Sequence, residues 1–273
     1  MNRRQATPLR FADTHLTTGV SLNYAEQGDS AGHPIILLHG YTDSWFSYSR
    51  VLPFLSPTYH TYALSQRGHG DSEQPPSGYT MPDFSADVIA FMDALGLPQV
   101  TLVGHSMGSL VAQEVALTAP ERVTRLILIG SATNMRSADV LQLQQEVNAL
   151  EDPVPAEFAR EFQVSTIYHP VPAEFLDRAV AESLKLPARV WRAALEGQLA
   201  VDYTGRINRI RMPTLVLRGD HDTIFPRPAQ DALPAGLPNA SLKVYPETGH
   251  ALHWERPSEF VSDLEEFIRT ASQ

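Results

Sequence analysis

A serine set between two glycines is the residue of this sequence whose setting most favours chemistry. The five residues GHSMG, from Gly104 to Gly108, follow an aliphatic run and precede a segment with the apolar spacing of a helix. Glycine on each side lets the chain turn sharply from a strand into a helix, so that the hydroxyl of Ser106 projects from the turn. The first amides of such a helix face developing negative charge. Ser106 is therefore a candidate nucleophile.

A serine hydroxyl needs a base within hydrogen-bond reach and a further group that orients the base. His250 follows Gly249 in a short loop between the last expected strand and the last expected helix, and this loop should open on the same sheet edge as Ser106. His253, three residues further on, is the second candidate for the base. Four other histidines follow expected strands and could line a site without acting as the base: His39, His69, His105 and His221.

Two aspartates compete for the orienting role. Asp220 and Asp222 flank His221 in the stretch LRGDHDTIFP, which follows a further aliphatic run. A histidine between two carboxylates could also suggest a metal site. The sequence has no H-E-x-x-H or other recognised metal pattern, and we expect neither a metal nor an organic cofactor.

These residues can meet only if several strands end at one edge of a sheet. Short aliphatic runs alternate with segments of helical spacing, which predicts an α/β protein with a mostly parallel central sheet flanked by helices. An antiparallel hairpin is expected at the N-terminal edge, where polar and apolar residues alternate around a glycine. The other expected strands are 35–39, 59–64, 100–104, 126–130, 214–219 and 242–245.

One long segment interrupts the alternation. Residues 131–212 contain no convincing strand, but they include several stretches of helical spacing separated by prolines. Structureless loops longer than about 15 residues are uncommon, so the segment is predicted to be a helical cap inserted into a core of residues 1–130 and 213–273. Ligands of open α/β sheets bind beyond the carboxyl ends of the strands, and the cap should cover that edge.

Composition limits the partners. The 273 residues carry a formal net charge of −10, which argues against nucleic acid or an anionic membrane as a partner. The sequence has no cysteine, so disulfides and thiol nucleophiles are excluded. The N-terminal stretch has no apolar segment behind its basic residues, so neither a signal peptide nor a membrane anchor is expected, and we expect a cytoplasmic protein.

Taken together, the motifs resemble the α/β-hydrolase fold family. The likeness covers almost the whole chain in one order: LLHGYTDSW, RGHGDS, GHSMG, the inserted cap, GDHDTIFP and GHALHWERP. It implies a triad in the order serine, acid, histidine, which falls here on Ser106, Asp222 and His250. It also implies an oxyanion hole made by the backbone N–H groups of Met107 and Tyr41.

The resemblance also favours one of the two aspartates. Gly219, Asp222 and Pro226 fit the family pattern G-x-x-D-x-x-x-P. A residue deeper in the loop has more reach toward a histidine on the next loop, which points the same way. Asp220 is expected to shape the turn by accepting backbone N–H groups two residues on.

The function implied is a serine hydrolase that cleaves carboxylic esters of small to medium apolar substrates without a cofactor. The same triad and fold serve lactonases and carbon–carbon bond hydrolases, and a low-turnover ligand receptor is a further alternative. A lipase acting at membrane interfaces ranks lower, because the cap is mixed and charged. The expected walls of the substrate pocket include Trp45, Phe162, Tyr168 and Trp191.

Overall fold

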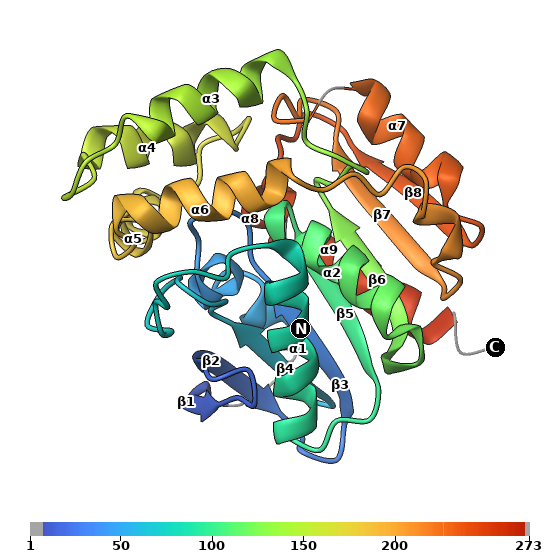
Figure 1. Cartoon of the computed structure of the whole chain (residues 1–273). Coiled ribbons are helices and arrows are strands. Elements are labelled where there is room, and N and C mark those ends of the chain that lie inside the picture. The colour runs from blue at the N-terminus through green and yellow to red at the C-terminus, as the bar shows by residue number, and fades with distance from the viewer. Residues whose placement is uncertain (1–7, 226, 271–273) are drawn as a thin grey trace.

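The computed structural model describes residues 8–225 and 227–270. Residues 1–7, part of the stretch without an expected signal peptide, and Pro226 of the acid motif lie outside these ranges. The central sheet has eight strands in the order β1-β2-β4-β3-β5-β6-β7-β8 (Figure 1). Strands β1 (Arg10–His15) and β2 (Ser21–Gly28) form an antiparallel hairpin, and β2 also pairs antiparallel with β4.

Six strands run parallel, as the alternation of runs predicts. The carboxyl ends of these strands therefore meet at one edge, where the loops that follow them can converge. The strands are β3 (His33–Leu38), β4 (Tyr59–Leu64), β5 (Val100–His105), β6 (Val123–Ile129), β7 (Thr214–Gly219) and β8 (Ala240–Tyr245). The predicted fold class is confirmed.

Alternate residues of the central strands pack on opposite faces of the sheet. Ile36 and Leu38 belong to the cluster that packs under α1 (Met81–Ala94) and α2 (Met107–Thr118), whereas Leu37 packs toward α9 (Pro257–Thr270). Figure 1 shows α1 and α2 on one face and α9 behind the sheet. The central strands are buried on both faces, which explains their continuous aliphatic sequence.

Four α-helices lie between β6 and β7, and Figure 1 shows them beyond the end of the sheet at which α2 begins. We call them the α3–α6 segment. The Ser137 side chain caps α3, and a proline immediately precedes each of the other three. Proline fits the position before a helix because its φ is fixed and it has no N–H to leave unpaired. The helices are α3 (Ala138–Asn148), α4 (Ala156–Ser165), α5 (Ala173–Ser183) and α6 (Ala188–Leu199).

The structure has two α-helices that sequence patterns did not predict. Helix α7 (Arg227–Gly236) contains Pro234, and its proline-rich sequence disguises the helical spacing that buries Leu233. Helix α8 (Leu252–Glu255) is a single turn ahead of α9. Among residues 8–225 and 227–270, no helix combines the length and apolar character needed to cross a bilayer.

Candidate active site

Ser106 occupies a sharp turn between β5 and α2. Its φ of 52° and ψ of −116° lie outside the regions that non-glycine residues favour. The two flanking glycines are needed because a Cβ at Gly104 would lie 2.2 Å from the Gly108 carbonyl oxygen, and one at Gly108 would lie 2.4 Å from that of Leu38. Their absence of side chains lets the start of α2 approach both its own strand and β3. The turn thus presents Ser106 at the carboxyl edge of the sheet.

His250 and Asp222 meet across two loops at this edge. His250 Nδ1 lies 2.9 Å from Asp222 Oδ2, and both side chains are almost completely buried. The second Asp222 oxygen accepts the Ile224 amide at 2.9 Å, which fixes the carboxylate in the turn. Among the described residues His250 Nε2 has no hydrogen-bond partner. The ring is therefore oriented through one nitrogen and leaves the other available to a substrate or nucleophile.

The other candidates of the same motifs lie elsewhere. Asp220 is partly exposed, contacts the ring of His221 at 2.7 Å and accepts the Thr248 amide at 3.3 Å. The expectation that Asp220 accepts an amide two residues on is wrong, because the Asp222 amide donates to the Gly219 carbonyl oxygen. A bond of that kind is instead made by Asp222, which accepts the Ile224 amide. His253 belongs to α8 and is fully buried with its Nε2 3.2 Å from Ser47 Oγ, and burial lowers its pKa to about 3.

Ser106 and His250 line one cavity of about 300 Å³ between the sheet edge and the α3–α6 segment. Much of its wall is apolar and comes from α3, α4 and α6, including Leu143, Phe162 and Leu195. A volume near 300 Å³ is at the lower end of the range for small-molecule sites. The cavity can enclose a compact ligand beside the serine.

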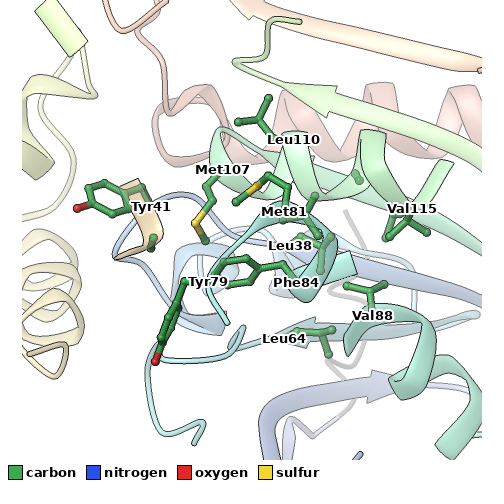
Figure 2. Close-up of a cluster of buried hydrophobic side chains, with 14 of the residues drawn as sticks. Leu38, Tyr41, Leu64, Tyr79, Met81, Phe84, Val88, Met107, Leu110 and Val115 are labelled. Atoms are coloured by element: carbon green, nitrogen blue, oxygen red, sulfur yellow. The ribbon is translucent and has the colours of Figure 1, made fainter. Parts of the chain in front are cut away.

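The two amides expected to form an oxyanion hole lie at the same place. Tyr41 lines the cavity and Met107 is the first residue of α2. In the described part of the chain, neither amide donates a hydrogen bond to a protein acceptor. The Met107 side chain is fully buried and points away into the core with Tyr79 and Phe84 (Figure 2), so only its backbone can serve the site.

Of the four aromatic residues expected to form the walls, only Phe162 lines the cavity. Trp191 is fully buried behind it and packs against Tyr41 and Phe162, with ring centroids 5.5 and 5.9 Å away. Trp45 packs against Phe11 at the outer edge of the sheet. Tyr168 is exposed and stacks on His221 at 3.9 Å. These three side chains do not line the cavity as expected, because tertiary packing decides which aromatic side chains reach it.

Sequence analysis did not single out Asp43, the buried acidic residue of the cavity wall. Asp43 follows the Tyr41 amide by two residues, lines the cavity and is 5% exposed. Burial raises the pKa of its carboxyl to about 7, although hydrogen bonds from Gln163 and Ser47 oppose that rise. The available signal was its position inside the motif LLHGYTDSW, directly behind the expected oxyanion donor.

Comparisons with known proteins agree with this fold. A family model described as the alpha/beta hydrolase fold matches residues 33–257. The chain is 29% identical to a non-heme chloroperoxidase of Streptomyces lividans, over 92% of this chain and 97% of that protein. It is 27% identical to 2-hydroxy-6-oxononadienedioate/2-hydroxy-6-oxononatrienedioate hydrolase 2 of Pseudomonas putida, over 92% of each chain.

A solved structure gives the same result. An esterase from Rhodococcus sp. ECU1013 superposes with a TM-score of 0.86 at 25% identity, covering 96% of this chain and 99% of that one. The match extends over the sheet and the α3–α6 segment alike. By its motifs, its strand order and its matches, the chain belongs to the α/β-hydrolase fold family of hydrolytic enzymes.

Proposed function

We propose that the protein is a serine hydrolase that cleaves carboxylic esters of small to medium apolar substrates through an acyl-enzyme. The observation that carries the proposal is the contact of His250 Nδ1 with Asp222 Oδ2, because His250 lines the same cavity as Ser106. The unpaired His250 Nε2 supports the role of a base, since it is the atom that would take the serine proton.

In the first half of the reaction, Ser106 Oγ attacks the ester carbonyl while His250 Nε2 takes its proton. Asp222 accepts the Nδ1 proton, holds the imidazole in that tautomer and stabilises its charged form. The amides of Tyr41 and Met107 donate to the oxygen that gains negative charge. Collapse of the intermediate breaks the bond to the alkoxy oxygen, which leaves as an alcohol with the proton from His250.

In the second half, water attacks the acyl carbon attached to Ser106. His250 takes a proton from the water and returns it to the serine oxygen, which releases the carboxylic acid and restores the enzyme. The amides of Tyr41 and Met107 again face the oxyanion. The sequence of steps requires no group beyond the protein and water.

The α3–α6 segment, residues 131–212 with their connections, would act as a cap that defines substrate size. Its residues supply most of the apolar wall opposite Ser106, including Val140, Leu143 and Phe162. A cavity of about 300 Å³ with much apolar wall suits short acyl or aryl groups better than long lipid chains. Lactones, which are internal esters, fit the same description and form the second candidate substrate class.

A panel of p-nitrophenyl esters of increasing acyl length, together with lactones, tests the proposal. We expect kcat/KM to peak at short or medium chains. Ser106→Ala should lower kcat by about 10⁵-fold or more. A fluorophosphonate probe should label the wild type and not this variant, as intact-mass spectrometry would show. Full esterase activity in Ser106→Ala would contradict the proposal.

A further inference from the structure

Asp43 places a second carboxyl group in the wall of the cavity that holds Ser106. Asp43 lies two residues after Tyr41, the expected oxyanion donor, and lines the same cavity as His105 and His250. A Cβ at Gly40 would lie 2.8 Å from His105 Nδ1 and 3.2 Å from Asp43 Oδ2, so the carboxyl reaches back toward the expected oxyanion site. Nothing in the proposed triad chemistry uses it.

Hydrogen bonds from the α3–α6 segment and from the loop after β3 hold this carboxyl in place. Gln163 of α4 donates from Nε2 to Oδ1 at 2.9 Å, and Ser47 donates from Oγ to Oδ2 at 3.2 Å. Gln163 Nε2 also donates to the Ser183 hydroxyl at 2.8 Å, and Ser47 Oγ accepts the indole N–H of Trp254 at 2.9 Å. The backbone of Gly40 is a third partner. A carboxylate can accept about four hydrogen bonds, so the group retains capacity for a ligand.

The charges around the cavity all have one sign. Besides the buried Asp43, three solvent-exposed acidic residues of α3 and α4 line it, namely Asp139, Glu146 and Glu161. Among the described residues that line the cavity there is no lysine or arginine. A substrate carboxylate beside Asp43 would have no cationic partner, and because Asp43 is buried little water would screen the repulsion.

We propose that Asp43 is a specificity-determining residue, whose buried carboxylate selects ester substrates that carry a cationic group and rejects those that carry a carboxylate. The inference rests on the proposed esterase function. It separates this chain from the Pseudomonas putida relative, whose name specifies dioate substrates. A buried carboxylate interacts strongly with a nearby ligand charge because little water screens the pair.

Protonation of Asp43 should modulate the selection. Burial brings the carboxyl pKa to about 7, so the group is mostly anionic at pH 8.5 and mostly neutral at pH 6. The titratable groups that face it are His250 and His105 across the cavity, His253 through Ser47, Tyr48, and Glu182, which lines a small adjoining cavity. A ratio of rates for two substrates cancels ionisations that affect both equally.

An isosteric pair of substrates tests the proposal. We would measure kcat/KM for p-nitrophenyl 4-(trimethylammonio)butanoate and for p-nitrophenyl 5,5-dimethylhexanoate, which has carbon in place of the charged nitrogen. At pH 8.5 the cationic ester should be preferred by about tenfold. The preference should fall to within about twofold in Asp43→Asn, which keeps the shape, and in the wild type at pH 6. The half acid p-nitrophenyl hydrogen adipate should show the opposite pattern against its methyl ester.

Glu146→Gln removes one charge from the same cavity and serves as the matched comparison. We expect it to change the ratio less than Asp43→Asn does. No preference in the wild type, or a preference that survives Asp43→Asn, would overturn the role of Asp43, and so would an equal effect of Glu146→Gln. If Asp43→Asn does not fold, the wild-type ratio at the two pH values decides. Failure of the wild type to hydrolyse any of these esters would instead refute the proposed function.

Discussion

The carboxylates of Asp220 and Asp222 differ in what they contact. Asp222 is buried and divides its oxygens between His250 and its own turn, whereas Asp220 is partly exposed and bonds the Thr248 amide and the His221 ring. Loss of the Asp222 charge would remove the acceptor that selects the tautomer of His250. Loss of the Asp220 charge would affect only a surface turn.

We therefore expect unequal costs for two matched substitutions. Asp222→Asn should lower kcat by about 10³- to 10⁴-fold, because the amide can favour the wrong imidazole tautomer. Asp220→Asn should lower it by less than about threefold, as surface substitutions generally do. Ester hydrolysis by both variants measures the difference, with circular dichroism to confirm folding. The reverse order would show that Asp220 orients the base.

At the element scale, a carboxylate of α8 joins the His250 loop to the connection between α4 and α5. Glu255 Oε1 accepts the amides of Gly249 at 2.8 Å and Tyr168 at 3.1 Å, and Oε2 accepts that of His169 at 2.8 Å. The Ala251 amide donates to the Thr166 carbonyl oxygen at 2.9 Å. The α3–α6 segment thus holds both chain neighbours of His250: Ala251 directly, and Gly249 through Glu255.

Glu255→Ala should release this loop. We expect kcat to fall by about 10- to 100-fold for every ester, with a smaller change in KM, because misplacement of a catalytic group by about 1 Å carries a cost of this size. Fluorophosphonate labelling of Ser106 should slow in parallel. Glu266→Ala, which removes a charge from the exposed face of α9, is the control and should leave both rates unchanged. Unaltered labelling in Glu255→Ala would contradict the positioning role.

Elements differ in how far the sequence predicts them, for physical reasons. Strand β5 and the turn at Ser106 were predictable, because a buried parallel strand and a sharp turn each require particular residues. Helix α7 was not, because Pro234 and its neighbours resemble a loop. The burial of Trp191 behind the cavity wall and the surroundings of Asp43 depend on contacts between residues more than 100 positions apart, such as that of Asp43 with Gln163. A local sequence pattern does not predict such contacts.

At the scale of the whole molecule, the fold encloses several neutral histidines. Burial lowers the pKa of His69 to about 4 and that of His253 to about 3, and it lowers the pKa of His39 and His105 well below the ordinary value. The pairs His39–His69 and His105–His253 have ring centroids 5.1 and 4.5 Å apart, so a charge on one disfavours a charge on the other.

These histidines predict acid lability. Below pH 6.5 the unfolded chain binds protons at these histidines and the folded chain does not. The free energy of unfolding is therefore unaffected by them above pH 6.5 and falls as the pH drops toward 4. His69 and His253 should each reduce the free energy of unfolding by about 2 kcal/mol at pH 5, and His39 and His105 should act in the same direction. Asp43, whose pKa is raised, binds a proton in the folded state between about pH 7 and 4 and opposes part of this loss. Urea titrations at pH 8, 6 and 5 measure the trend, and constant stability would contradict it.

The α3–α6 segment and the sheet share one hydrophobic cluster, in which Trp191 and Leu195 join Leu38 and Met107. Tyr41 adds a hydrogen bond from its hydroxyl to the Trp191 carbonyl oxygen at 2.6 Å. For protein engineering, this continuity makes the segment a poor unit for exchange between relatives, because a transplant would meet a surface shaped for different side chains. Changes of substrate range are better sought by single replacements on the cavity-facing sides of α3 and α4.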